Sequence, residues 1–432
     1  MKIYNYPSKI AENRILSIIN RGLRFKKKDI SEVSRIITNV RKYGDEAVIQ
    51  YTNRFDSPAL TVDSMKITPA EIIRAKKSVG PGFVRSLNRA IKQITLFHQQ
   101  QLKKSWFSTE RPGTLVGQMV NPIEIAGVYV PGGKGGNTPL VSTVLMCAIP
   151  AKIAGVDQVI MLTPPRADGT VNPYLLVAAQ KVGVDAVYKM GSAWGIAALA
   201  YGTETVPKAD IIVGPGNIYV MLAKKALSGT VGTDIIAGPS EILIIADSTA
   251  IPEFVAADLL SQAEHDILAS ALLLTTSRSL ANEVAAVLGK QLRILKRRDI
   301  AEKSLAKYGA ILVVPDLNTA FDLANRIAAE HLELQIKNPM EHIRAVRHAG
   351  AVFIGNYTPE AVGDYMAGPN HVLPTGGTAR YASALSVDNF IKTTSLIHYS
   401  RVPFQQEAKD IIRLAEIEGL EAHANAIKIR LR

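Results

Sequence analysis

Cysteine is almost absent from this 432-residue sequence, which contains only Cys147. A single cysteine cannot close a disulfide within the chain, so a disulfide framework is excluded and a reducing compartment fits best. A cysteine-rich zinc site is excluded for the same reason. Any bound metal must therefore be held by nitrogen and oxygen ligands.

Long apolar runs are missing as well. The most apolar stretch, residues 140–156, is interrupted by Ser142, Thr143, Pro150 and Lys152, whereas a membrane-spanning helix needs about 20 nearly unbroken apolar residues. The N-terminus MKIYNYPSKIAENRI lacks the apolar run and the small-residue cleavage site of a secretory signal. We therefore expect a cytoplasmic protein with no membrane segment.

The charge pattern shows no acidic excess. The 50 Lys and Arg residues outnumber the 38 Asp and Glu residues, which gives a formal net charge of +12. A local basic cluster lies in RGLRFKKKD, residues 21–29, and elsewhere basic residues are mixed with acidic ones as on a solvated surface. We expect no nucleic acid partner, but a polyanion-binding face stays open as the alternative.

The remaining composition is that of a folded globular protein, with 47% apolar and 20% charged residues. At about 150 residues per domain, the length predicts two to four domains. The first 120 residues show mostly helical spacing of apolar residues. One predicted helix covers residues 31–51 and breaks near Gly44, and another covers residues 87–102.

From about residue 125, short β-branched runs alternate with helical segments. The first series lies at residues 125–130, 159–163, 186–190 and 210–213, and the second at 241–247, 271–276, 310–315, 332–336 and 351–355. Strands at this spacing, separated by helices, are typical of βα units and parallel sheets. The two series predict an α/β protein with two doubly wound parallel-sheet lobes, followed from about residue 386 by a helical tail.

Glycine-rich turns follow two strands of the first series. PGGKGGNTP, residues 131–139, comes after AGVYV, and GPGN, residues 214–217, comes after DIIV and opens a helix. Such turns let a backbone approach a phosphate with free N–H groups. Neither matches GxGxxG, so each is either a ligand-binding turn or a tight connection.

Two further segments carry candidate ligands. GPSE, residues 238–241, stands at the junction of the two series, where Ser240 is either a site residue or a turn cap. In LLSQAEHDI, Gln262 and His265 are three residues apart on a predicted helix and therefore share one face. An imidazole beside a carbonyl oxygen can hold a divalent cation, and the alternative is a core or surface histidine.

Candidates for acid–base chemistry lie farther along the chain. Glu330 and His331 stand between a helix and the strand LELQI, where they either accept protons with different basicity or cap the helix. The segment GDYMAGPNHVLPTGGTARY, residues 363–381, places Asp364 and His371 among glycines and prolines and is too stiff and polar for a simple linker. Together these residues predict a metal-assisted enzyme and leave room for a nucleotide.

In this order, the segments resemble histidinol dehydrogenase, the family of the last two steps of histidine biosynthesis. The resemblance runs from RKYGDEAVIQYTNRFD through GVYVPGG, GPGNIYV, AGPSEILIIAD, LLSQAEHD and AEHLEL to AGPNHVLPTGGTARY and EGLEAHANA. It covers nearly the whole chain, and LLSQAEHD and GPNHVLPT are specific motifs.

The resemblance implies one zinc ion per subunit. The ligands would be Gln262, His265, Asp364 and His423. His423 lies in the helical tail, which in this family reaches the metal of the partner subunit in a domain-swapped homodimer.

The same resemblance assigns catalysis to Glu330 and His331. His331 would take the hydroxyl proton of L-histidinol as hydride leaves to NAD, giving L-histidinal. Glu330 would then activate water, and a second NAD would oxidise the hydrate to L-histidine. The zinc would orient the substrate by chelation.

The other implied contacts form two sets. The substrate contacts are Ser240, Gln262, His265, His331, Asp364, His371, Glu418 and His423. The NAD contacts are Tyr129, Trp194 and Asn217. Trp194 stands where the family has a glutamine, and its ring could stack on the nicotinamide or the adenine in place of the amide hydrogen bonds.

The implied domains are a helical segment (1–26), a main α/β lobe with the metal and catalytic residues (27–127 and 241–385), an inserted NAD-binding lobe (128–240) and a helical tail (386–432). Both lobes would be incomplete Rossmann-like sheets. The alternative on the same scaffold is a sister NAD-dependent dehydrogenase of another small polar alcohol, such as a sulfonated diol. The predicted zinc ligands together with Glu418 favour histidinol.

Overall fold

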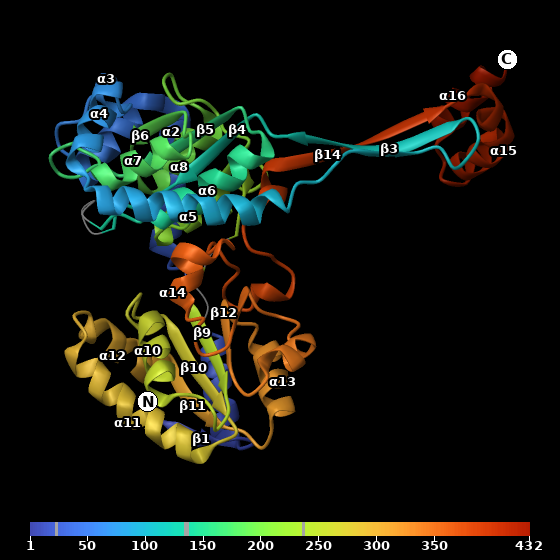
Figure 1. Ribbon diagram of the computed structural model, residues 1–432. Coiled ribbons are helices and arrows are strands. Elements are labelled where there is room, and N and C mark those ends of the chain that lie inside the picture. Colours follow the sequence, from blue (N-terminus) through green and yellow to red (C-terminus); the bar gives the residue numbers. More distant parts are fainter. Residues whose placement is uncertain (22–24, 134–137, 236–237) are drawn as a thin grey trace. The chain divides into compact units, whose positions relative to one another are not determined.

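The computed structural model describes residues 1–21, 25–133, 138–235 and 238–432. They divide into two units (Figure 1). The first unit is Met1–Gln101 with Glu124–Phe390, and the second is Leu102–Ile123 with Ile391–Arg432. Positions 134–137 of the predicted glycine-rich turn lie outside the described residues.

A six-stranded parallel sheet forms one part of the first unit. Its strands are β1 (Ile3–Asn5), β9 (Glu241–Ala246), β10 (Ser270–Thr275), β11 (Gly309–Val313), β12 (His331–Gln335) and β13 (Ala351–Ile354). Their order is β1-β11-β10-β9-β12-β13, and all neighbours run parallel. Along β9, Leu243 and Ile245 pack in one core cluster and Ile242 and Ile244 in another. Burial on both faces explains why these strands read as continuous apolar runs.

Helices cover both faces of this sheet. One core cluster includes residues of α1 (Lys9–Ile19) and α13 (Leu317–Ile327), and the other includes residues of α10 (Pro252–Ala263), α11 (Arg278–Ile294) and α12 (Arg298–Tyr308). The shorter helices are α14 (Glu360–Val362), η2 (Pro339–Ala345), η3 (Gly363–Ala367), η4 (Thr378–Arg380), η5 (Val387–Phe390) and, in the second unit, η6 (Ile429–Leu431).

A five-stranded parallel sheet forms the other part of the first unit. Its strands are β4 (Ile125–Tyr129), β5 (Gln158–Thr163), β6 (Ala186–Lys189), β7 (Ile211–Val213) and β8 (Gly232–Thr233), in the order β6-β5-β4-β7-β8. Its helices are α6 (Val141–Ala154), α7 (Pro173–Lys181), α8 (Ser192–Tyr201) and α9 (Ile218–Leu227). The two sheets confirm the predicted α/β class, and the nine predicted strands between residues 125 and 355 are all present within about two residues of their expected ends.

Four N-terminal helices pack beside the five-stranded sheet. They are α2 (Lys27–Phe55), α3 (Val62–Met65), α4 (Pro69–Ser78) and α5 (Pro81–Gln99). α2 packs on α8 and α9, α4 on α7, and α5 on α6. The predicted break is confirmed at Gly44, where φ is +51° and the carboxylate of Glu204 occupies the space that a Cβ would need.

The second unit is a small antiparallel sheet followed by helices. It contains β2 (Trp106–Ser108), β3 (Thr114–Pro122), β14 (Ile391–Tyr399), α15 (Arg401–Ile417) and α16 (Glu421–Lys428), with the strand order β14-β3-β2. The tail is therefore not wholly helical as expected, because β14 pairs with β3 along its full length. β2 and β3 likewise interrupt the first 120 residues, which the apolar spacing predicts as mostly helical.

The packing of the N-terminal segments differs from the expected domain boundaries. Residues 1–26 do not stand apart, since β1 joins the six-stranded sheet and α1 packs in one of its core clusters. α2 shares its core with the five-stranded sheet, not with the six-stranded sheet. α2 belongs to this core because its apolar face packs against α8, which is far away in sequence.

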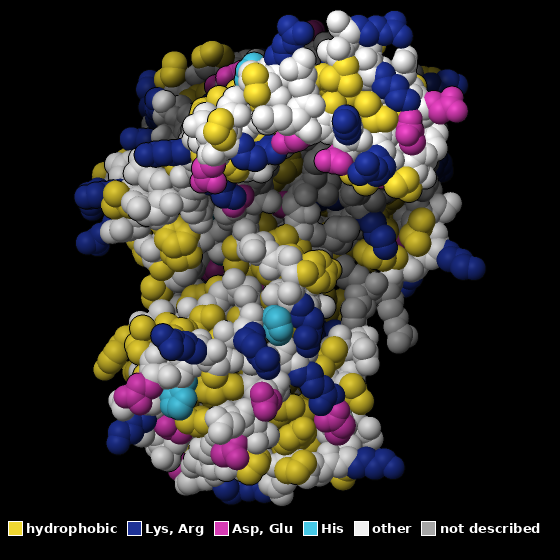
Figure 2. All heavy atoms as spheres, turned by 90° about the vertical axis from the view of Figure 1, so that its right-hand side faces the viewer, with side chains coloured by type: hydrophobic (Ala, Val, Ile, Leu, Met, Phe, Trp, Pro, Cys, Tyr) yellow, Lys and Arg dark blue, Asp and Glu magenta, His cyan; other side chains and the backbone are white. Residues whose placement is uncertain are grey.

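Among the described residues, no helix combines the length and the apolar content that crossing a membrane requires. On the face shown in Figure 2, Lys and Arg side chains are dispersed among acidic, apolar and other residues. This distribution resembles the mixed, solvated surface that the sequence predicts.

Candidate active site

The candidate acid–base pair lies at the amino ends of two neighbouring strands. His331 is the first residue of β12, Glu330 precedes it, and Glu241 is the first residue of the adjacent strand β9. All three residues are buried. Open α/β sheets usually bind ligands at the carboxyl ends of their strands, so this cluster departs from that rule.

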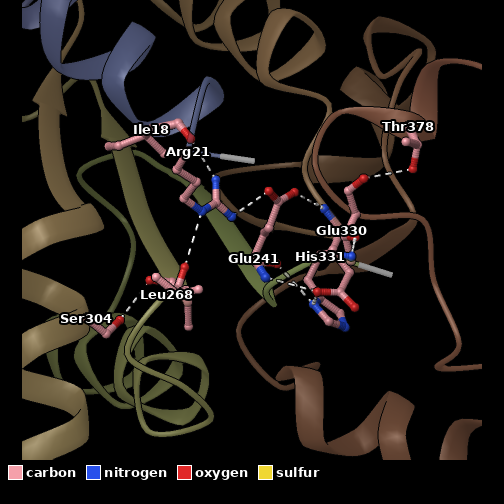
Figure 3. Close-up of polar contacts among 11 residues, drawn as sticks. Ile18, Arg21, Glu241, Leu268, Ser304, Glu330, His331 and Thr378 are labelled. Atoms are coloured by element: carbon pink, nitrogen blue, oxygen red, sulfur yellow. Dashed lines mark hydrogen bonds and ion pairs between the residues drawn. The ribbon is translucent and has the colours of Figure 1, made fainter. Parts of the chain in front are cut away.

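Reciprocal hydrogen bonds join these residues (Figure 3). The Glu241 N–H donates to the Glu330 carboxylate at 2.9 Å, and the Glu330 N–H donates to the Glu241 carboxylate at 3.2 Å. His331 Nδ1 lies 3.0 Å from the Glu241 carbonyl oxygen. Because a carbonyl only accepts, Nδ1 carries the hydrogen, and the neutral ring presents Nε2 as its acceptor.

Burial shifts the pKa of both Glu330 and His331. It raises the pKa of Glu330 well above the ordinary value, and the nearby carboxylate of Glu241 acts in the same direction. It lowers the pKa of His331 to about 3. His331 is therefore neutral near pH 7, and Glu330 becomes a stronger base than an exposed glutamate.

The predicted metal ligands of the first unit approach this pair. Gln262 lies in α10 and is fully buried, and Asp364 lies in η3. Burial raises the pKa of Asp364 to about 6, and the neighbouring His265 opposes that shift. His331, Glu360 and Asp364 offer ligand atoms that all lie within 4.8 Å of one another. His265 and Asp364 influence each other's pKa, so these two predicted ligands lie near one another although they come from separate segments. His265 is exposed and lies in the turn after α10, not on the helix as predicted, because α10 ends at Ala263.

Glu360, in α14, is a site residue that the sequence analysis missed. It is 3% exposed, and its Oε1 lies 3.7 Å from His331 Nε2. With the Gln262 amide turned so that both of its ends are bonded, its nitrogen donates to both Glu360 carboxylate oxygens at 2.6 Å and its oxygen accepts from the Glu241 N–H at 2.8 Å. The available signal was its spacing four residues before Asp364, which places both on one face of a helical turn.

A cavity of about 390 Å³ opens beside the pair. Its lining includes Phe97, Gln101, His331, Phe353, Asp364 and His371. Burial lowers the pKa of His371 to about 4, and its Nε2 has no hydrogen-bond partner among the described residues. A buried nitrogen without a protein partner in a cavity wall suits a ligand contact. Ser240 stands just before β9, and its carbonyl accepts the N–H of Ser270 at 3.0 Å.

Two predicted residues belong to the second unit. Glu418 is the residue that ends α15, and His423 lies in α16. Both are exposed. Their part in substrate and metal binding stays a prediction.

The predicted NAD contacts Tyr129 and Asn217 stand at the carboxyl ends of strands in the five-stranded sheet. Tyr129 ends β4, and its hydroxyl accepts the N–H of Ser192 at 3.1 Å. Asn217 follows β7 and caps α9, where its side chain accepts N–H groups of Tyr219 and Val220 at 3.0 and 3.2 Å. Both contacts to NAD stay predictions.

Trp194, the third predicted NAD contact, packs against α2. It is 3% exposed and stacks with Tyr51 and Phe55 of α2 at centroid distances of 5.9 and 5.7 Å. Its Nε1–H donates to the Thr52 hydroxyl at 3.0 Å. The predicted contact of Trp194 with NAD stays a prediction, although α2, which the sequence assigned to another lobe, already packs against this ring.

The turn after β7 rests on a buried ion pair that the sequence analysis also missed. Lys224 pairs with Asp234 and donates to the Gly214 carbonyl at 2.9 Å, while Asp234 accepts the Gly214 N–H at 2.6 Å. Gly214 has a φ of +111°, and a Cβ there would lie 2.2 Å from the Tyr129 carbonyl oxygen. Only glycine fits this turn.

Comparison with known proteins identifies the family. The histidinol dehydrogenase family model matches residues 20–431. Histidinol dehydrogenases of Desulfotalea psychrophila and Nitratidesulfovibrio vulgaris are 54% and 52% identical over 402 and 398 residues, covering 93% and 92% of this chain and 93% and 91% of theirs. The crystal structure of histidinol dehydrogenase from Elizabethkingia anophelis superposes with a TM-score of 0.93 at 36% identity, covering 100% of this chain and 98% of that one. This chain therefore belongs to the histidinol dehydrogenase family of oxidoreductases.

Proposed function

We propose that this chain oxidises L-histidinol through L-histidinal to L-histidine with two NAD, using one zinc ion per subunit. The observation that carries the proposal is the buried pair Glu330–His331, which is bonded to Glu241 and lies beside Gln262 and Asp364. These groups provide proton acceptors and metal donors within one site, as a metal-assisted alcohol oxidation requires.

The donor set of the site fits zinc. Gln262, His265 and Asp364 supply an amide, an imidazole and a carboxylate, which are nitrogen and oxygen donors of the kind zinc accepts. His423 of the partner subunit would be the fourth ligand. When bound, zinc supplies charge that orients the substrate and polarises its oxygen.

His331 would serve as the base in both oxidations. With its hydrogen held on Nδ1 by the Glu241 carbonyl, Nε2 is free to accept the hydroxyl proton while the carbinol hydride leaves to NAD. The product is L-histidinal and one NADH. His371 and Ser240 would hold the substrate, together with Glu418.

Glu330 would activate water between the two oxidations. Its raised pKa suits it to take a proton from water that adds to the aldehyde carbon. The resulting hydrate loses its hydride to a second NAD and its hydroxyl proton to His331. One water is consumed and two NADH are formed for each L-histidinol.

NAD would bind at the carboxyl ends of the five-stranded sheet, next to Tyr129 and Asn217. The strand order β6-β5-β4-β7-β8 supports a Rossmann-like lobe, because order reverses between β4 and β7 where such sheets bind nucleotides. The glycine turn at Gly214 and the start of α9 offer backbone N–H groups to a pyrophosphate.

The second unit supports a homodimer with a swapped tail. Among the described residues, its buried apolar side chains are Pro403 and three alanines of helical segments, Ala408, Ala415 and Ala424. Ile397 and Ile417 are 75% and 76% exposed. Exposed apolar side chains on so small a core call for another surface to cover them, and a second copy would bring Glu418 and His423 with it.

The decisive experiment counts NADH. Zinc-loaded protein is incubated with L-histidinol and excess NAD, and we expect two NADH per L-histidinol, with activity lost on chelation and restored by zinc. His331→Asn should lower kcat by about 10²–10⁴-fold with full zinc content. Turnover of a sulfonated diol without turnover of L-histidinol would replace the proposal with its alternative.

A further inference from the structure

A buried ion pair stands behind the catalytic pair. Arg21 lies just after α1, and its guanidinium is 2.5 Å from the carboxylate of Glu241, with the two side chains 4% and 5% exposed. The other Arg21 donors reach backbone carbonyls of Leu268 and Ile18 at 3.2 and 2.9 Å. Because two carbonyl oxygens and one carboxylate oxygen bind the guanidinium from different directions, they hold it in one position (Figure 3).

Glu241 connects this fixed guanidinium to both catalytic side chains. One carboxylate oxygen faces Arg21, and the other accepts the Glu330 N–H at 3.2 Å. Its own N–H holds the Glu330 carboxylate at 2.9 Å, and its carbonyl fixes the Nδ1 hydrogen of His331 at 3.0 Å. The Glu241 carboxylate is thus bonded to the Glu330 backbone, and the Glu241 backbone is bonded to both catalytic side chains, so a displacement of the whole residue would move the acid and the base together.

Arg21 keeps Glu241 in that position. A buried carboxylate without a cation is strongly disfavoured, and here the Glu330 carboxylate lies next to it. Without the guanidinium, Glu241 would turn away from the Glu330 N–H or take up a proton. We propose that Arg21 and Glu241 form a positioning pair that holds Glu330 and His331 in their catalytic geometry, and this inference rests on the proposed function.

The test compares Arg21→Met with the double variant Arg21→Met/Glu241→Gln. Arg21→Met leaves a buried carboxylate unpaired, and we expect kcat for L-histidinol to fall by about 10²-fold while KM and zinc content stay near wild type. The glutamine of the double variant still offers an oxygen to the Glu330 N–H and needs no cation. The double variant should therefore recover most of the lost kcat.

Arg326→Met is the matched control. Arg326 forms an ion pair with Glu12 of α1, so it also ties the N-terminal segment to this lobe, but its side chain is 37% exposed and lies outside the catalytic contacts. Its kcat should stay near wild type. If Arg21→Met behaves like Arg326→Met, or if the double variant shows no recovery, the positioning role is wrong.

A spectroscopic readout separates this inference from the proposed function. With ¹⁵N-labelled histidine, the His331 signal, assigned by its loss in His331→Asn, should report a hydrogen on Nδ1 in wild type and in the double variant but not in Arg21→Met. Wild-type protein that fails to oxidise L-histidinol would contradict the proposed function. An unchanged His331 tautomer in Arg21→Met would contradict the positioning pair, whatever the substrate.

Discussion

The ends of the two parallel sheets use polar side chains in opposite ways. At the amino ends of β9 and β12, buried polar atoms meet at a cavity, and His371 Nε2 there has no partner among the described residues. At the carboxyl ends of the five-stranded sheet, Trp194, Lys224 and Asp234 are bonded to neighbouring protein groups. The amino ends of the six-stranded sheet leave polar side chains available to a ligand. At the carboxyl ends of the five-stranded sheet, polar side chains instead hold neighbouring protein groups in place.

This difference explains which of the predicted site residues the structure brings together. Acid–base and metal chemistry requires particular side chains, so Glu330, His331 and Asp364 stand out in the sequence and come together in the structure. Binding a dinucleotide through turn backbone requires only the right conformation. Side chains near such a turn can serve packing, as Trp194 does.

Breaking the Lys224–Asp234 ion pair, which is bonded to the turn at Gly214, should have the largest effect on stability. Lys224→Met removes the partner of Asp234, whose side chain is 1% exposed, and should lower the free energy of unfolding by about 3–5 kcal/mol. Urea unfolding measures the loss. The adjacent exposed residue provides the control, since Lys225→Met should change the same quantity by less than about 0.5 kcal/mol. Equal stabilities for the two variants would contradict a scaffold role for this edge.

Removing Glu360 should weaken metal binding at the other edge. Its carboxylate accepts the amide of Gln262 at 2.6 Å, and loss of such a supporting group typically costs about 10–100-fold in metal affinity. Competition with a chromophoric chelator measures zinc affinity for Glu360→Ala directly. Glu253→Ala, at the exposed start of the same helix α10, should bind zinc as wild type does. Wild-type zinc affinity in Glu360→Ala would show that zinc binding does not depend on the hydrogen bonds between Gln262 and Glu360.

Trp194→Phe should have the smallest effect of the three substitutions. It tests directly whether a side chain near the carboxyl ends of the five-stranded sheet serves packing or binds NAD. The variant keeps a ring against α2 but leaves the Thr52 hydroxyl without its donor, which should cost about 1–3 kcal/mol of stability. The KM for NAD should stay unchanged because the ring is taken up by packing. A raised KM for NAD at unchanged stability would instead restore the expected stacking on the cofactor.

The parts of the fold that sequence could predict are those with a local signal. The nine strands from residue 125 to 355 are short apolar runs bounded by turns, and the kink at Gly44 follows from its freedom of φ. β14 has mixed polar and apolar residues and depends on pairing with β3, so no local pattern marks it. Arg21 has an ordinary local context, and only the fold supplies its partner Glu241. Glu360 has no local signal except its spacing before Asp364, and only the fold brings it to His331.

The sequence by itself determined the α/β class, the family and the residue types of the chemistry, because periodicity and motif spacing are written along the chain. Only the tertiary structure decided that Glu330 and His331 lie at the amino ends of their sheet and that Arg21 pairs with Glu241 beside them. It also decided that Trp194 packs against α2. These outcomes depend on contacts between segments far apart in sequence. Such contacts contribute strongly to the free energy of folding because the groups that make them are buried.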